Sequence, residues 1–359
     1  MEVDREYRIY SYTTTNPGEE PASFLLRLRL HGKFFSVEVN ESLFRNSPAR
    51  LSEFHQYLSF LQFDEGGLED DEDGPESPGS HPVQQGISID DCFEWTVQPL
   101  LETFKELAPE PALASKIMLD AFFSSVSYEC RLGAVDERLY PGPIDALPTE
   151  PPFIPDNLSP GATTVHGTPA SAFFPIFPRS EIEVLSDAPS RILDHDPTTV
   201  RVHGAEYFFK SLEAVGEDLG RMEIRKYEDI AKARFGPAVR TSRLFGIAQD
   251  AQRAVKGIML HRIAEEGTLD SLVRPETPRE TRQRWSRQIQ QTLGALHDRD
   301  IVWGDAKAAN VLVDVEGDAW IIDFGGGYTR GWVDEDGAGT IAGDLEGLQN
   351  IIRFINAEE

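Results

Sequence analysis

The pattern of apolar and polar residues predicts a β-hairpin followed by a helix near the N-terminus. Apolar and polar side chains alternate along Ser23 to Leu30 (SFLLRLRL) and again along FFSVEV, on either side of the glycine turn His31-Gly32-Lys33. Apolar residues then recur at three- and four-residue steps after Ser47-Pro48, namely Leu51, Phe54, Leu58 and Leu61. This spacing indicates an amphipathic helix from Pro48 to Phe63.

A second helix and a further strand complete the N-terminal pattern. Apolar residues at helical spacing run from Asp90 to Leu107, and Pro99 within them forces a kink or a later start. The alternation along Phe122 to Leu132 predicts a strand. Residues 1–139 are therefore expected to form a small α+β region. None of its residues cluster like a catalytic site, so an interaction module, a regulatory module and an extra layer on the following domain all stay open.

Two segments interrupt these patterns. Residues 64–82 are acidic and contain glycine and proline, and like-charge repulsion without apolar anchors predicts a disordered loop there. Residues 140–178 are rich in proline and small residues and predict an extended connector. Its apolar groups, Phe153-Ile154 and Phe173 to Phe177, are expected to lie on a neighbouring domain surface.

The C-terminal half shows strands first and helices later. Three strands are expected at Glu181 to Leu185, Thr198 to Val202 and Glu206 to Lys210, then a helix from Met222 to Arg234 and two further strands at Leu244 to Ile247 and Gly257 to Ile263. A long helix should begin at Thr277-Pro278-Arg279-Glu280, where a threonine cap, a proline and a glutamate make the pattern of a capping box.

Composition narrows the classes of function. The 359 residues, 40% of them hydrophobic, suffice for two domains of ordinary size. A net charge of −27 repels phosphate backbones and argues against a nucleic-acid partner. Only Cys92 and Cys130 are present, which fits an intracellular, cytoplasmic or nuclear, reducing compartment. The N-terminus has no secretory signal pattern, and no apolar run approaches membrane-spanning length, so no membrane partner is expected.

The stretch from Ile301 to Gly327 (IVWGDAKAANVLVDVEGDAWIIDFGGG) carries the candidate chemistry. Asp305, Lys307 and Asn310 precede one apolar run, and Asp323-Phe324-Gly325 closes the next. The two runs predict a short hairpin turning at 316–318, which would bring both polar ends to one cleft. Carboxylate, amide and ammonium groups that converge in this way suit phosphoryl transfer, which needs positioned charge more than covalent help.

These motifs, with DFGGGYTRGWVD and GDLEGL, resemble a compact group of fungal protein-kinase-like proteins over residues 179–356. The resemblance implies a two-lobed fold and the cofactors ATP and Mg²⁺. It assigns Asp305 to accept the proton of the attacking hydroxyl and Lys307 to steady the transferred phosphate. It assigns Asn310 and Asp323 to hold the metal ion, and Asp344 to brace the catalytic loop.

The resemblance also implies a nucleotide site. Lys210 would bridge the α- and β-phosphates, and Glu223 of the next helix would hold it, with Glu228 as the second candidate. The hinge backbone at Leu260, His261 and Arg262 would bond adenine.

Four features depart from the kinase pattern. Residues 186–197 contain no glycine, whereas kinases cover the phosphates with a glycine-rich loop. Phe208 stands two residues before Lys210, where kinases keep a small residue. Trp303-Gly304-Asp305 replaces H-R-D, and the chain has few residues after Asp344 for later helices. Without that arginine, switching by activation-loop phosphorylation should be absent.

The sequence therefore predicts an α+β protein in three parts: the N-terminal region 1–139, the connector 140–178, and a kinase-like domain 179–359 with a truncated C-terminal lobe. The first interpretation of its function is an ATP-dependent phosphotransferase, serine/threonine protein kinase-like, with a nucleotide and a protein or small-molecule acceptor as partners. A pseudokinase that serves as a binding or scaffold module is the alternative, and a small-molecule kinase, suggested by Trp303-Gly304-Asp305, is a third possibility.

Overall fold

The structure, a computed structural model, is a mixed α and β fold that divides into two compact units. It describes residues 6–16, 18, 21–70, 88–110, 116–123, 126–147, 173–186, 192–212, 217–251, 253–327 and 329–357. Unit 1 consists of Met1–Pro152 with Ser186–Asp196, and unit 2 consists of Phe153–Leu185 with Pro197–Glu359.

Unit 1 is built on a mixed sheet. Its strands are β1 (Arg8–Thr14), β2 (Ser23–Leu30), β3 (Lys33–Arg45), β4 (Ser127–Val135), β5 (Arg138–Pro141) and β6 (Asp145–Leu147). Their order is β1-β2-β3-β4-β5, with β6 also on β4, and the β3–β4 pair is parallel. The predicted hairpin is confirmed: Leu30 pairs with Lys33 across a turn in which His31 and Gly32 have φ of 46° and 82°.

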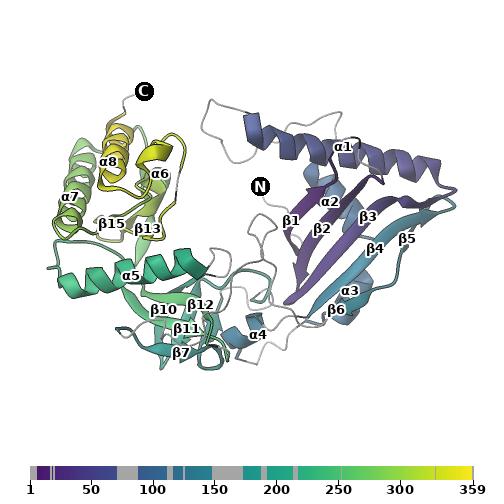
Figure 1. The fold of residues 1–359 in the computed structure, drawn as a ribbon, viewed down its shortest axis with the longest axis horizontal. Coiled ribbons are helices and arrows are strands. Elements are labelled where there is room, and N and C mark those ends of the chain that lie inside the picture. Colours follow the sequence, from purple (N-terminus) through teal and green to yellow (C-terminus); the bar gives the residue numbers. More distant parts are fainter. Residues whose placement is uncertain are drawn as a thin grey trace. The chain divides into compact units, whose positions relative to one another are not determined.

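Helices cover one face of this sheet (Figure 1). They are α1 (Pro48–Asp70), α2 (Ile89–Val97) and α3 (Leu101–Leu107). The short helix α4 (Leu119–Phe123) lies outside the core that they share with the sheet and contacts Arg29 of β2 through Phe122. Alternate residues of β2 and β3, such as Leu28 and Val37, are fully buried with Phe54 of α1, Val97 of α2 and Phe104 of α3. The parallel β3–β4 pair requires a long crossover, which α1 to α4 provide.

Several predicted boundaries in unit 1 are wrong. Helix α1 continues past Phe63 to Asp70, so the first residues of the expected acidic loop are helical. The rest of that loop, residues 71–82, lies outside the described residues. The expected helix from Asp90 to Leu107 is two helices, because residues 98–100 around Pro99 form a turn. Phe122 belongs to α4 rather than to the strand that follows.

The expected connector contributes strands at both ends. Residues 138–141 and 145–147 form β5 and β6 on the unit 1 sheet. Residues 176–178 form β7, which pairs in parallel with a strand of unit 2. The pairing of β7 with β11 joins segments far apart in the chain, whereas β5 pairs with the adjacent β4 across the turn at Asp136 and Glu137. Composition reveals neither pairing. The middle of the connector, residues 148–172, lies outside the described residues.

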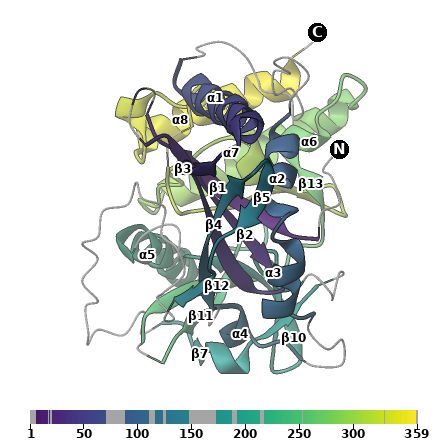
Figure 2. The ribbon, with the colours of Figure 1, turned by 90° about the vertical axis from the view of Figure 1, so that its right-hand side faces the viewer.

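Unit 2 begins with a second sheet and a helix. The sheet order is β7-β11-β12-β10-β9-β8. The elements are β7 (Ile176–Pro178), the 3₁₀ turn Arg179–Glu181, β8 (Glu183–Leu185), β9 (Thr199–Val202), β10 (Ala205–Ser211), α5 (Glu217–Ala233), β11 (Leu244–Gln249) and β12 (Val255–His261). Figure 2 shows α5 alongside these strands, and Ile224 and Ile230 of α5 share a buried core with Ile247 and Ile258.

The rest of unit 2 is a small sheet among helices. It comprises β13 (Glu265–Thr268), α6 (Leu269–Leu272), α7 (Arg279–His297), the 3₁₀ turn Ala308–Asn310, β14 (Val311–Asp314), β15 (Ala319–Ile321), the 3₁₀ turn Glu335–Gly337 and α8 (Ile341–Asn356). The predicted hairpin of β14 and β15 is confirmed. Ile289 and Leu293 of α7 pack in one core with Val311 and Ile321 of the hairpin.

The capping box predicted at the start of α7 is wrong. Pro278 takes the cap position, and no side chain caps the helix. The Thr277 hydroxyl instead accepts the N–H of Arg274 at 2.9 Å and donates to the Leu272 carbonyl at 3.4 Å, so it closes the preceding turn. Among the described residues, no helix combines the length and the apolar character needed to cross a membrane.

Candidate functional site

Three charged side chains, carried by three different segments of unit 2, form one half of the candidate site. Lys210 on β10 donates to Oε1 of Glu223 on α5 at 2.9 Å and to Oδ1 of Asp323, after β15, at 2.6 Å. Lys210 lies at the end of an apolar strand, and Glu223 lies on the face of α5 that packs against the sheet. The expected pairing of Lys210 with Glu223 is therefore present in the structure, and Asp323 joins it.

Burial sets the electrostatics of this group. Glu223 has no solvent exposure, and burial raises the pKa of its carboxyl although Lys210 opposes the shift. Burial alone would lower the pKa of Lys210, but the two carboxylates outweigh it and raise that pKa. Glu223 Oε2 is buried and has no hydrogen-bond partner among the described residues. A Cβ on Gly325 would stand 3.1 Å from this atom, so Gly325 keeps the space beside it open.

The loop between α7 and β14 forms the other half. Asp305 Oδ2 forms an ion pair with the Lys307 ammonium at 2.8 Å and accepts the Asn310 amide N–H at 2.9 Å, while its Oδ1 accepts the Thr329 hydroxyl at 3.1 Å. Lys307 also donates to Thr329 at 2.8 Å. The three residues expected from spacing thus meet around one carboxylate, and Thr329 joins them.

A run of glycines links the two halves. A Cβ on Gly325 would stand 3.2 Å from Asp323 Oδ1 and 3.3 Å from Lys210 Nζ, whereas one on Gly327 would stand 3.7 Å from the Asp305 carboxyl carbon. Asp323 itself has φ of 59°, a left-handed conformation that is uncommon for a residue other than glycine. Strained backbone of this type occurs often at ligand sites.

Asp344 of α8 braces the loop from behind. Its buried carboxylate accepts the backbone N–H groups of Trp303 and Gly304, each at 2.7 Å, and contacts His297 Nε2 at 2.9 Å. The fully buried Trp303 indole N–H donates at 2.8 Å to the carbonyl of Ile322, the residue before Asp323. The chain before Asp305 is therefore tied both to α8 and to the chain before Asp323.

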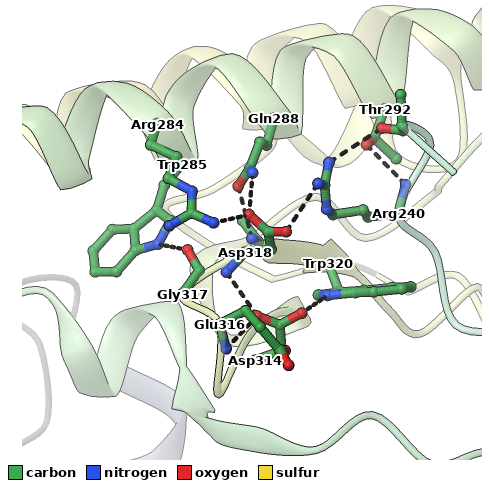
Figure 3. A network of polar contacts seen from close by, with 12 residues as sticks. Arg240, Arg284, Trp285, Gln288, Thr292, Asp314, Glu316, Gly317, Asp318 and Trp320 are labelled. Atoms are coloured by element: carbon green, nitrogen blue, oxygen red, sulfur yellow. Dashed lines mark hydrogen bonds and ion pairs between the residues drawn. The ribbon is translucent and has the colours of Figure 1, made fainter.

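The turn of the β14–β15 hairpin is tied to α7 by a polar network (Figure 3). Asp318 accepts from Arg240 at 2.9 Å, from Gln288 at 2.5 Å and from Arg284. Burial would raise the pKa of Asp318, but the hydrogen bonds from Gln288, Arg284 and Arg240 lower it below its usual value. Asp314 closes the turn from inside by accepting the N–H of Asp318 at 2.7 Å. This network holds the hairpin that carries the candidate site.

The same arginines line an open cavity of about 530 Å³ that is separate from the candidate site. Its lining residues are Pro237, Ala238, Arg240, Arg284, Arg287, Gln288 and Gln291. Two of its three arginines already pair with Asp318, so we assign the network a structural role.

The expected hinge residues lie at the end of β12. Leu260 is buried and pairs with Phe208 of β10, while His261 and Arg262 are exposed. The backbone N–H of His261 donates to the Arg243 carbonyl at 2.9 Å, so it already has a hydrogen-bond partner within the protein. Burial and the nearby Arg243 lower the pKa of the His261 ring. Phe208 is 43% exposed and lies on the same face of β10 as Lys210, two residues away.

The connection from β8 to β9, residues 186–196, groups with unit 1. The carboxylate of Asp194 accepts the N–H of Gly32 at 3.1 Å, and Tyr10 donates to Asp196 at 3.3 Å. A Cβ on Gly32 would stand 2.9 Å from Leu193, which shows how closely the segment approaches the turn between β2 and β3. The described contacts of residues 193–196, in the segment that would cover the phosphates in a kinase, are thus made within unit 1.

The donor set fits magnesium bound together with a phosphate ligand. Lys210 and the N–H of Gly325, at 3.1 Å, both donate to Oδ1 of Asp323, and the Asn310 amide nitrogen donates to Asp305. The second oxygen of Asp323 and the amide oxygen of Asn310 remain as candidate ligands, and hard oxygen atoms are what Mg²⁺ prefers. The described residues contain no group of three or more His, Cys, Asp or Glu side chains able to hold a metal. Phosphate oxygens and water would have to complete the coordination.

Sequence reasoning missed two polar residues at this site. Thr329 bridges Asp305 and Lys307, and Lys226 of α5 donates to the Trp303 carbonyl at 3.1 Å. The spacing of Lys226, one turn after Glu223 on the same helix face, was the available signal. No comparable signal marked Thr329, because its contact depends on how the chain turns after Gly327.

The comparisons with known proteins give no identification: no protein-family model matches this chain, and no curated protein matches it either.

Proposed function

We propose that unit 2 is an ATP-dependent phosphotransferase of the protein-kinase type. The observation that carries the proposal is the meeting of two charged groups across Gly325 to Gly327: Lys210, Glu223 and Asp323 on one side, and Asp305, Lys307 and Asn310 on the other. An ammonium for the nucleotide phosphates, metal-binding oxygens and a carboxylate beside a second ammonium are the parts that phosphoryl transfer requires.

Asp305 accepts the proton in the proposed reaction. The acceptor hydroxyl forms a new bond to the γ-phosphorus of ATP, the bond from that phosphorus to the β-phosphate oxygen breaks, and ADP leaves. The hydroxyl proton passes to the Asp305 carboxylate and then to solvent. Lys307 stands 2.8 Å from this carboxylate and can contact the transferred group, while Thr329 and Asn310 orient the carboxylate.

Lys210 contacts the α- and β-phosphates in this proposal, and Glu223 holds its ammonium in place. Asp323 and Asn310 would hold Mg²⁺, which when bound neutralises charge on the phosphates. The exposed Phe208 offers a flat apolar surface for the adenine ring, and the backbone from Leu260 to Arg262 offers polar groups, apart from the N–H of His261. The phosphate acceptor is a hydroxyl of a protein, a serine or threonine in the leading case, or of a small molecule.

The cysteines support an intracellular place for this reaction. Cys92 and Cys130 are both free and buried. Burial raises the pKa of each thiol to about 12, which keeps the thiols protonated and unreactive.

A non-catalytic nucleotide-binding module is the second candidate function. The observation that favours it is the β8–β9 connection, which has no glycine and contacts unit 1 through Asp194. A site without a backbone cover over the phosphates can bind a nucleotide and still fail to transfer its phosphate.

An assay of γ-phosphate transfer from radiolabelled ATP distinguishes a phosphotransferase from a non-catalytic nucleotide-binding module. The protein, a generic basic protein and water serve as acceptors, and the variants are Asp305→Asn and the exposed control Asp336→Asn. We expect Asp305→Asn to lower the transfer rate about 10²- to 10⁴-fold, the usual contribution of a general base, and Asp336→Asn to match the wild type. ATP binding should stay nearly intact in both variants.

Two outcomes would contradict the first proposal. Equal transfer by Asp305→Asn and wild type would remove Asp305 from the reaction. ATP binding by the wild type without any transfer would favour the non-catalytic module.

A further inference from the structure

Lys226 extends from α5 toward the catalytic loop. It lies three residues after Glu223 and therefore on the same face of the helix, one turn closer to the C-terminal end. Its side chain is partly buried, and its ammonium donates to the Trp303 carbonyl at 3.1 Å. One helix thus presents an acid to Lys210 and a cation to the loop before Asp305.

The bond from Lys226 completes a clamp on a single peptide group. The carbonyl of the peptide between Trp303 and Gly304 accepts from Lys226, and the N–H of the same peptide donates to Asp344 Oδ1 at 2.7 Å. The peptide dipole therefore lies between a cation on α5 and a carboxylate on α8. Hydrogen bonds to ionised groups are stronger than neutral ones. Because Asp305 follows Gly304 directly, the orientation of this peptide contributes, together with Asn310 and Thr329, to where the Asp305 carboxylate points.

Two glycines allow the ammonium to reach this position. Gly304 has φ of 96°, and a Cβ there would stand 2.8 Å from Lys226 Nζ. A Cβ on Gly326 would stand 3.9 Å from the same atom. A side chain at position 304 would both strain the backbone and displace the ammonium. Lys226 thus contacts the loop before Asp305 and also approaches the chain after Asp323.

Lys226 is partly buried, so its charge loses hydration, and this loss costs free energy unless nearby groups compensate for it. Burial lowers the pKa of Lys226, and the carboxylates of Asp344, Glu223 and Asp323 oppose that shift. An apolar side chain could pack in the same place without loss of hydration. The ammonium is therefore held by the Trp303 carbonyl and by the field of three carboxylates.

We propose that Lys226 is a positioning residue that couples the placement of α5 to the orientation of Asp305. This inference rests on the proposed phosphotransferase function and deepens it. When α5 packs against the sheet, Glu223 holds Lys210 while Lys226 holds the peptide before Asp305, so one helix sets both halves of the site. Phe324 reinforces the coupling, because its ring lies edge-on to Tyr227 of α5 with centroids 5.4 Å apart.

The test compares Lys226→Met, Lys226→Arg and Lys232→Met in the full chain. Lys232 lies on the same helix, is exposed, and pairs locally with Glu228 and Asp229, so it is the matched control. Phosphate transfer from radiolabelled ATP gives kcat and the KM for ATP, and hydrogen exchange measured by mass spectrometry reports residues 301–306. Denaturation midpoints establish that each variant is folded.

We expect Lys226→Met to lower kcat about 10- to 100-fold, the scale of a small misplacement of a catalytic group, with the KM for ATP changed less than twofold. Lys226→Arg should recover much of kcat, because a guanidinium can also donate to the carbonyl. Exchange in residues 301–306 should be faster in Lys226→Met and unchanged in Lys232→Met.

Wild-type kcat in Lys226→Met, or wild-type exchange of residues 301–306, would overturn the proposal. So would an increase in KM without loss of kcat, since Lys226 would then serve nucleotide binding. A wild type that transfers no phosphate would refute the phosphotransferase function itself, and the exchange measurement would still decide whether Lys226 holds the loop.

Discussion

At the scale of single residues, the candidate site contains a buried glutamate, Glu223, that forms an ion pair with Lys210. Glu223 is fully buried, and Lys210, which is 24% exposed, donates to its Oε1. Removal of one partner from a buried ion pair leaves an uncompensated charge, which costs more than the pair contributes. Loss of this ion pair should therefore change the free energy of unfolding. This change can be measured without a nucleotide or a phosphate acceptor.

We expect Lys210→Met to lower the free energy of unfolding of unit 2 by about 3 kcal/mol at pH 8. The reason is the pKa of Glu223, which burial already raises above its ordinary value of 4.5 and which loss of Lys210 should raise further. An acid whose folded pKa exceeds its unfolded pKa destabilises the fold as pH rises through that interval. The deficit of Lys210→Met should therefore be small near pH 4.5 and grow toward pH 8. Urea denaturation at several pH values measures it.

The double variant Lys210→Met/Glu223→Gln is the matched control, because it removes the buried charge together with its partner. It should recover most of the stability lost in Lys210→Met at pH 8. A deficit that stays the same from pH 5 to pH 8 would show that the methionine disturbs packing and that Glu223 is not the titrating group.

At the scale of elements, the β14–β15 hairpin carries the site only if its turn stays in place. Asp318 joins that turn to α7 through Gln288 and Arg284, and to the chain before β11 through Arg240. Trp285 adds an indole N–H to the Gly317 carbonyl at 3.1 Å. These contacts come from side chains on three segments, so their loss should loosen the turn as a whole.

We expect Asp318→Ala to lower the free energy of unfolding by about 2 kcal/mol, the scale of a lost hydrogen bond to a charged group. Arg240 and Arg284 would lose their shared carboxylate in this variant. Glu316→Ala in the same turn is the control, because that side chain is exposed, and its effect should stay within about 0.5 kcal/mol. Equal midpoints for the two variants in urea denaturation would refute the role given to Asp318.

Local patterns predicted some helix ends better than others. The sequence around Thr277 matches a capping box, yet Thr277 serves the preceding turn and α7 has no side-chain cap. A true capping box occurs at Ser88, which accepts the N–H of Asp91 at 3.2 Å while Asp91 accepts the Ser88 N–H at 2.8 Å. At the start of α7, the Thr277 hydroxyl bonds the preceding turn at Arg274 instead of capping the helix. That turn depends on the path of the chain, which residue spacing alone does not reveal.

At the scale of the whole molecule, the candidate site was more predictable than the division of the chain. Asp305, Lys307 and Asn310 lie within six residues, so their meeting follows from one short loop, and the hairpin that brings Asp323 near is also local. The strand β7 was missed because its partner β11 lies far along the chain. The strands β5 and β6 pair with the nearby β4, and they were missed because a composition rich in proline and small residues indicates an extended connector. The grouping of residues 186–196 with unit 1 was equally hidden, since it depends on contacts such as the one from Gly32 to Asp194.

Calorimetric titration of ATP shows whether this site binds a nucleotide. We expect the wild type to bind ATP with magnesium and Asp323→Ala to weaken binding at least tenfold, about 1.4 kcal/mol. Omission of magnesium should weaken binding to the same extent, because Asn310 alone is a poor ligand for Mg²⁺. Lys210→Met should also weaken binding, and the exposed control Asp336→Ala should not. Equal affinity with and without magnesium, in the wild type and in both site variants, would contradict the assignment of this site to a nucleotide.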